Sequence, residues 1–317
     1  MSEVLFSIII PLYNKAEWIE KTIECVLSQV EKNYEIIIID DGSSDGSDKI
    51  VKNITDDRIR FIRQKNQGVS VARNNGIMAA NGKYVSFLDA DDLWESDYLS
   101  VTRELFKKYP KAKIACPSYK VRYNKKEVIP TWRNVSTTED CILSNFLETA
   151  KSKFWIVNSS CITIERKVLL EMEKIFPVGE TVYEDFDLWI RLGVRYPIAH
   201  SNKVCSTYNR MTDTNARVTH TNKVVYSKTF MCTLNELLSS KELSNEQKLL
   251  IREIKDRRMV PYIFSLLLTR QRKIAKQEIK YWIPVKVYKK YKYGLRIAVY
   301  MPYFFINWVQ KIRYHVF

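Results

Sequence analysis

The sequence is poor in glycine and lacks the glycine-rich motifs that bind phosphate in two large enzyme classes. It has 8 glycines in 317 residues. No G-x-G-x-x-G segment follows the first apolar run, and no G-x-x-x-x-G-K-[ST] segment occurs. The main sequence signals of a dinucleotide-binding Rossmann enzyme and of a P-loop NTPase are therefore missing, which argues against both classes.

Other absences concern cysteine pairs, a leader and a membrane span. The six cysteines are scattered without a C-x-x-C pair, so neither a zinc site nor a disulfide scaffold is expected, and a reducing cytoplasm suits them. The start, Met1-Ser2-Glu3, has no basic region before its apolar run, so we expect no signal peptide. The most apolar late segment, 295–309, is shorter than the roughly 20 residues of a membrane-spanning helix.

Charge is unevenly distributed along the chain. The formal net charge is +15, yet residues 1–100 hold 17 acidic against 11 basic side chains. The remaining residues are therefore strongly basic. Such a balance indicates an anionic partner, whether a phosphate-bearing substrate, an anionic lipid surface or nucleic acid.

The first 118 residues alternate between strand-like and helix-like patterns. Because the strands are apolar on both faces, they predict a mostly parallel sheet with helices on both sides, an α/β fold. The expected strands are 6–12, 34–39, 59–62, 84–88 and 113–116, and the expected helices are 15–30 (with Asn14 as N-cap), 45–54, 69–80 and 97–108.

An acidic cluster follows the fourth of these strands. The apolar run 84–88 ends at Asp89, Asp91 and Asp92. Such carboxylates repel one another unless a cation lies between them, which favours a Mg²⁺ or Mn²⁺ site for a phosphorylated ligand. The alternative is a loop that caps the next helix, with Asp92 or Ser96 as N-cap. Polar residues also follow the first two strands, and parallel strands bring such ends to one edge. This favours the metal site.

Four segments in register carry a resemblance to a known family. S-I-I-I-P-L-Y-N at 7–14, D-D-G-S-S-D at 40–45, N-Q-G with A-R-N at 66–74, and L-D-A-D-D at 88–92 resemble the family-2 glycosyltransferases. These are inverting enzymes of the GT-A fold. The resemblance covers about the first 120 residues.

The resemblance implies roles for residues of the donor site. Pro11 and Tyr13 match the wall beside the nucleotide base, and Asp41 matches the carboxylate that accepts the imide N–H of uracil. Arg73 matches a position near the nucleotide. The site residues of the acidic cluster are then divided: Asp89 meets the ribose, and Asp91 or Asp92 binds Mn²⁺ or Mg²⁺. The sequence leaves the direct metal ligand open between these two.

The resemblance also implies a catalytic base in V-Y-E-D-F-D-L-W at 182–189. Asp185 matches the family's general base for the acceptor hydroxyl, with Glu184 and Asp187 as fallbacks. Acidic residues are also common at helix N-termini for electrostatic reasons alone. Processive members carry Q-x-x-R-W shortly after the base, and this sequence does not, so the resemblance implies one sugar added per encounter.

The C-terminal third is helical, basic and aromatic. Helices are expected over 223–239 and 246–272, and residues 247–317 carry 17 Lys or Arg and three acids. We expect a GT-A domain over 1–221, divided into a nucleotide-sugar half (1–118) and an acceptor half (119–221), and a helical region over 222–317. Basic residues beside aromatic rings suit an anionic membrane surface, and a packing domain or dimer interface is the alternative. Nothing else supports nucleic-acid binding.

The expected protein is a cytoplasmic glycosyltransferase on the inner face of the cell membrane. It would move one sugar from a nucleotide-sugar donor, with a UDP-sugar expected, to a saccharide or polyprenol-linked acceptor for a surface polysaccharide or glycolipid. A nucleotidyltransferase on a related sheet is a weaker alternative, because no glycine-rich loop follows the first strand. A non-catalytic membrane scaffold is the third, and the intact acidic set argues against it.

Overall fold

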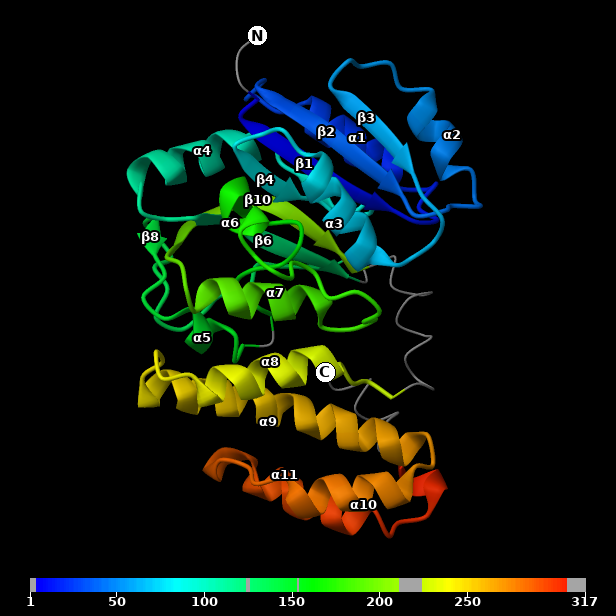
Figure 1. The fold of residues 1–317 in the computed structure, drawn as a ribbon, viewed down its shortest axis with the longest axis vertical. Helices are drawn as coiled ribbons and strands as arrows, with labels where there is room; N and C mark the ends of the chain where they lie inside the picture. The colour runs from blue at the N-terminus through cyan, green and yellow to red at the C-terminus, as the bar shows by residue number, and fades with distance from the viewer. Residues whose placement is uncertain (1–3, 124–125, 153, 211–223, 307–317) are drawn as a thin grey trace. The chain divides into compact units, whose positions relative to one another are not determined.

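The structure is a computed structural model that describes residues 4–123, 126–152, 154–210 and 224–306. Two compact units make up the chain, Met1–Thr212 and Asp213–Phe317 (Figure 1). The boundary expected between residues 221 and 222 lies outside the described residues.

The first unit is built on one ten-stranded sheet in the order β3-β2-β1-β4-β9-β6-β10-β5, with β7 and β8 paired to β6 and β10. Strands β3, β2, β1 and β4 are parallel neighbours, and β6 is parallel to β10. The short β9 is antiparallel to both β4 and β6 and joins these two parts. The strands are β1 Phe6–Leu12, β2 Tyr34–Asp40, β3 Ile59–Arg63, β4 Tyr84–Phe87, β5 Leu93–Trp94, β6 Ile114–Tyr123, β7 Lys126–Val128, β8 Cys141–Ile142, β9 Thr163–Glu165 and β10 Ile198–Asn209.

Helices cover both faces of this sheet, as the apolar strands predict. Alternate residues of β1 point to opposite faces. Ile8 and Ile10 lie in one buried cluster with Ile19, Ile23 and Tyr98 from two helices. The other face packs against α3. The helices of this unit are α1 Ile19–Leu27, α2 Ser47–Lys52, α3 Val69–Ala79, α4 Tyr98–Lys108, α5 Phe146–Thr149, α6 Arg166–Leu170 and α7 Glu184–Gly193.

The packing of α3 on the sheet depends on a glycine. A Cβ atom on Gly76 would lie 2.4 Å from Cγ2 of Ile9 on β1. Only a residue without a side chain allows the helix to approach the strand this closely. The close contact fixes where α3 places Arg73, one turn earlier on the same helix.

The first helix begins later than the sequence pattern predicts, at Ile19 instead of Lys15. Asn14 has a φ of 51° and is not the N-cap. Its backbone N–H donates to Oγ of Ser43, and the N–H of Lys15 donates to Oγ of Ser47, both at 3.0 Å. These bonds hold the segment after β1 against Ser43 and the start of α2. The sequence pattern alone indicates a longer first helix in this segment.

The second unit is helical. It contains α8 Lys228–Ser239, α9 Asn245–Leu268, α10 Arg272–Tyr281 and α11 Lys289–Ala298, with a short 3-10 turn at Lys286–Tyr288. Helix α9 begins with a capping box formed by Ser244 and Gln247. It ends at Leu268, four residues before the expected 272, and Arg270 just beyond it takes a φ of 62°. No helix among the described residues is long and apolar enough to cross a membrane.

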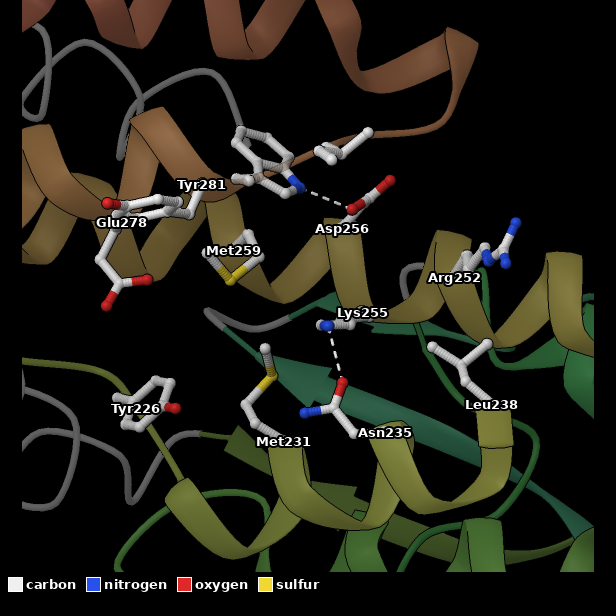
Figure 2. Close-up of a pocket in the computed structure, with 12 residues that line it drawn as sticks. Tyr226, Met231, Asn235, Leu238, Arg252, Lys255, Asp256, Met259, Glu278 and Tyr281 are labelled. Carbon is white, nitrogen blue, oxygen red and sulfur yellow. Dashed lines mark hydrogen bonds between the residues drawn. The ribbon is translucent and has the colours of Figure 1, made fainter. Parts of the chain in front are cut away.

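A buried carboxylate connects the helices of this second unit. Asp256 on α9 accepts a hydrogen bond from Nε1 of Trp282 at 2.6 Å (Figure 2). It also accepts the backbone N–H of Val285 at 2.7 Å. Burial raises the pKa of Asp256, and these two bonds oppose the increase. The contact fixes the segment that follows α10 against the middle of α9.

Candidate active site

The nucleotide-binding candidates lie where β1 and β2 end side by side. Leu12 is paired with Asp40, and the side chain of Tyr13, the next residue, is 49% exposed. The buried carboxylate of Asp41 accepts the backbone N–H groups of Gln67 and Gly68, both at 2.8 Å, and Nε2 of Gln64 at 2.7 Å. A carboxylate has about four acceptor positions, so these three donors leave room for the N–H of a base.

The three aspartates after β4 differ in their surroundings. Oδ1 of Asp89 lies 2.7 Å from a guanidinium nitrogen of Arg73. Oδ2 of Asp91 lies 2.5 Å from Nζ of Lys15. These two carboxylates remain partly exposed, at 31% and 16% of their side-chain surfaces. Each of the two carboxylates is therefore accessible to solvent and has a cation beside it.

Asp92 is instead part of the protein interior. Only 2% of its surface is exposed. Oδ1 accepts the backbone N–H of Asn209 at 2.7 Å, and Oδ2 accepts the hydroxyl of Ser160 at 2.5 Å. Burial raises the pKa of Asp92 well above its ordinary value, and the nearby charges of Asp91 and Asp89 raise it further. The carboxylate thereby connects the turn after β4 to the end of β10.

Arg73 joins the acidic cluster to the late acidic motif. Its side chain is 4% exposed, and its guanidinium lies 2.7 Å from Oδ1 of Asp89 and 3.5 Å from Oε1 of Glu184. The guanidinium carbon also lies 5.3 Å from the ring centroid of Phe176. Residues 89 and 184, widely separated in the sequence, therefore belong to one site. Figure 1 shows α3, which carries Arg73, and α7, which begins at Glu184.

The late acidic motif opens α7, as the sequence predicts. Oδ1 of Asp185 accepts the N–H of Phe186 at 2.8 Å. Burial and the neighbouring charge of Asp185 raise the pKa of Glu184 to about 7, although Arg73 lowers it. Burial also raises the pKa of Asp185, and Arg73 again opposes the increase. Two carboxylates with raised pKa values beside one arginine are typical of a site that transfers protons.

The third acid of the motif has a different environment. Asp187 is 1% exposed, and its Oδ2 lies 2.8 Å from the guanidinium of Arg191 one turn later. Arg191 also donates to the backbone oxygens of Lys174 and Ile175. Asp187 therefore stabilises α7 and the loop before it, and the structure does not bring it to Arg73.

Sequence reasoning missed three residues that organise this site: Lys15, Ser160 and Asn209. Lys15 directly follows the Tyr13-Asn14 pair, so its closeness to the cluster could have been inferred from the parallel sheet. Ser160 precedes β9 and Asn209 ends β10, far along the chain, and only the fold brings them to Asp92. No local signal in the sequence marks them.

A metal at this edge would have few protein ligands. Among the described residues, no three His, Cys, Asp or Glu side chains converge to hold an ion. Mg²⁺ commonly uses one or two carboxylates and completes its shell with substrate phosphates and water. A single partly exposed carboxylate such as Asp91 fits that pattern when a diphosphate supplies the remaining oxygens.

The second unit has a cavity of its own, of about 440 Å³ (Figure 2). Lys255 donates to Oδ1 of Asn235 at 2.7 Å within it. Nε1 of Trp282 donates to Oδ1 of Asp256 at 2.6 Å there as well. The lining residues are Tyr226, Met231, Asn235, Leu238, Arg252, Lys255, Asp256, Met259, Glu278, Tyr281, Trp282 and Ile283.

The sheet order and the acidic edge define a GT-A glycosyltransferase fold, and comparison with solved structures agrees. Residues 1–349 of TarS from S. aureus in complex with UDP-GlcNAc superpose with a TM-score of 0.71 at 15% identity, over 93% of this chain and 88% of that chain. The mannosyltransferase PcManGT from Pyrobaculum calidifontis, in complex with GDP-Man and Mn²⁺, gives 0.59 at 16% identity, over 97% and 86%.

Sequence comparison establishes the family. The model of glycosyl transferase family 2 matches residues 7–171, and the chain belongs to this family. An uncharacterized glycosyltransferase of Rickettsia felis is 48% identical over 96 residues, which is 30% of this chain and 16% of that protein. Chondroitin synthase of Escherichia coli is 28% identical over 212 residues, 65% of this chain and 29% of that protein. The chain thus spans less than a third of each of these two relatives.

Proposed function

We propose that this glycosyltransferase moves a single sugar from a UDP-sugar to a hydroxyl of a saccharide or lipid-linked saccharide, with inversion at the anomeric carbon. The observation that carries the proposal is the shared contact of Arg73 with Asp89 and Glu184. It joins a donor-binding edge to an acidic motif in one site. The residues that would stabilise the leaving group and those that would activate the acceptor then act on one donor–acceptor pair.

On the donor side, we assign each predicted residue the role that the resemblance implies. Pro11 and the exposed Tyr13 form the wall for the base, and Asp41 accepts its imide N–H. Asp89 binds the ribose hydroxyls. Asp91, rather than the interior Asp92, is the metal ligand, because 16% of the Asp91 side chain is exposed whereas Asp92 is only 2% exposed.

The cofactor is Mn²⁺ or Mg²⁺. When bound, the ion neutralises the charge that develops on the departing diphosphate. Lys15, at 2.5 Å from Asp91, holds a positive charge at the same place. Arg73 adds a second fixed cation and orients Asp89, so the leaving group enters a pre-organised positive environment.

On the acceptor side, Asp185 is the general base. It takes the proton of the acceptor hydroxyl as that oxygen attacks the anomeric carbon from the face opposite the diphosphate, which inverts the configuration. Arg73 favours the ionised form of Asp185 against the effect of burial. Glu184 is held by Arg73 and positions that guanidinium between the two halves.

The similar proteins support the substrate classes proposed. TarS was solved with UDP-GlcNAc and PcManGT with GDP-Man and Mn²⁺, and the relatives include a chondroitin synthase. We propose a role in surface polysaccharide or glycolipid synthesis at the cytoplasmic face of the cell membrane, on a polyprenol-linked acceptor. The donor is settled by a screen of UDP- and GDP-sugars that measures nucleotide release with and without Mn²⁺.

The decisive test of the site is Asp185→Asn. Loss of a general base lowers the transfer rate by roughly 10² to 10⁴-fold, while UDP affinity in the presence of Mn²⁺ remains within about twofold of wild type. Glu171→Gln, at a carboxylate that is 58% exposed on the same unit, is the matched control and keeps full activity. Loss of UDP binding in Asp185→Asn, or an unchanged rate, would contradict the assignment.

A further inference from the structure

The last described stretch of the second unit, residues 272–306, exposes many large apolar side chains. It has as many of them as the rest of the described chain together. Ile283 is 90% exposed and Phe304 is 73% exposed. Soluble proteins rarely leave such a concentration in water, and it usually marks an interaction surface. The members are Ile274, Tyr281, Ile283, Val287, Tyr291, Tyr293, Ile297, Tyr300, Phe304 and Phe305.

The same stretch is strongly basic. It contains nine Lys or Arg and a single acid, Glu278. Several of the cations lie over the exposed rings: Nζ of Lys276 is 4.3 Å from the ring centroid of Tyr300, and Nζ of Lys290 is 5.2 Å from that of Tyr291. Positive charge and exposed apolar area therefore occur on the same part of the surface.

Helix α11 displays this combination in its most regular form. Leu295 is its one buried residue. At 100° per residue, Tyr293 and Ile297 lie on the side opposite Leu295. Lys289 and Arg296 flank that pair on one side and Lys290 flanks it on the other. The helix thus presents an apolar pair bordered by three cations.

We propose that this face of α11, together with Ile283 and Val287, which are exposed in the segment that leads into α11, docks the enzyme on an anionic lipid bilayer. We call these seven residues the docking surface. Aromatic rings lie at headgroup depth, aliphatic side chains reach the acyl boundary, and Lys and Arg contact anionic headgroups. The assignment rests on the membrane association proposed above and names the residues that produce it.

Charge and side-chain type select this occupant over others. A second copy of the chain would bring one basic surface against another, and like charges repel at such an interface. Single-stranded nucleic acid binds by stacking bases on aromatic rings, a role that Ile283, Val287 and Ile297 cannot fill. Exposed aliphatic side chains between cations match a bilayer interface, and the helix lies in it without spanning it.

The test measures sedimentation of the full chain with vesicles, without donor or acceptor, so it does not depend on sugar transfer. Vesicles of phosphatidylcholine alone are compared with vesicles that contain phosphatidylglycerol as well. We expect binding to the anionic vesicles only, reduced by added salt. Equal recovery with both vesicle types would overturn the proposal, as would binding to an oligothymidine or self-association in place of vesicle binding.

Two variants separate the electrostatic and apolar parts of the docking surface. Lys289→Gln/Lys290→Gln/Arg296→Gln should weaken partitioning into anionic vesicles on the order of 100-fold, at about fivefold per cation. Tyr293→Ser/Ile297→Ser should weaken it roughly tenfold.

Matched controls carry the same changes at exposed positions elsewhere. Lys107→Gln/Lys111→Gln/Lys167→Gln alters three exposed lysines of the first unit, and Leu249→Ser alters a side chain on α9 that is 48% exposed. These variants should bind as wild type does. If they lose as much binding as the docking-surface variants, net charge or general hydrophobicity explains the effect, and the assignment to α11 is wrong. Urea unfolding of each variant verifies that it is folded.

Discussion

Replacing Asp92 and Asp91 separately by alanine tests how the acidic cluster divides its work. Asp92→Ala removes the acceptor of the Asn209 N–H and of the Ser160 hydroxyl. Each buried donor left without a partner costs about 1–3 kcal/mol. Relief of a buried carboxylate whose pKa is raised offsets part of this loss. We therefore expect the free energy of unfolding to fall by about 3 kcal/mol, a large part of a typical total of 5–15 kcal/mol.

Asp91→Ala should behave in the opposite way. Its carboxylate is partly exposed and paired with Lys15, and pairs of this kind contribute about 0–1 kcal/mol to stability. Unfolding should change little, whereas Mn²⁺ affinity in the presence of UDP should fall by roughly 100-fold or more.

The assay has two parts. Urea unfolding is monitored by tryptophan fluorescence, and Mn²⁺ binding is measured by titration with electron paramagnetic resonance. Asp57→Ala, at an exposed position of the same unit, is the control for both measurements. Two results together would refute the division of roles. One is an Asp92→Ala protein that is as stable as wild type but no longer binds Mn²⁺. The other is an Asp91→Ala protein that still binds Mn²⁺.

Two further predictions concern charges beside the cluster. The pKa of Glu184 is raised from 4.5 to about 7, so the folded chain holds this proton more tightly than the unfolded chain does. The stabilisation from this group is therefore complete below pH 4.5. It falls by about 3 kcal/mol as the pH rises to about 7. Urea unfolding at pH 5 and pH 8 should show a smaller difference in Glu184→Gln, and an unchanged difference would contradict the shift. Lys15→Met removes the cation at Asp91 and should tighten binding of Mn²⁺ alone by roughly fivefold; weaker binding in the same titration would show that Lys15 assists the ion.

Much of the fold could be predicted from the sequence because its strands are long, apolar and separated by amphipathic helices. Strand β2 is buried at every position from Tyr34 to Asp40, so its pattern admits few other interpretations. The antiparallel β9 has only three residues, and a segment that short carries no periodicity. The late start of α1 was not predicted either, because the hydroxyl groups of Ser43 and of Ser47, the first residue of α2, hold the backbone of Asn14 and Lys15 outside the helix.

The sequence predicts which elements carry the candidate residues, and it says less about the contacts between them. The carboxyl ends of β1, β2 and β4 follow from a parallel sheet, so Asp41 and Asp89 could be placed together from the sequence. The resemblance to the family supplied Asp185. The sequence could not distinguish Asp91 from Asp92, because the partners of Asp92 are the hydroxyl of Ser160 and a backbone N–H of β10. Both come from distant segments that no local pattern links to the cluster.

The guanidinium shared by Asp89 and Glu184 has a consequence for the order of events in the catalytic cycle. A donor whose ribose engages Asp89 competes with Arg73 for that carboxylate, and Arg73 then becomes more available to Glu184 and Asp185. Donor occupancy would thereby lower the proton affinity of the acids that serve the acceptor. By linkage, deprotonation of those acids would strengthen donor binding by the same factor. One buried arginine would thus couple occupancy of the donor site to the ionisation of the acids that serve the acceptor.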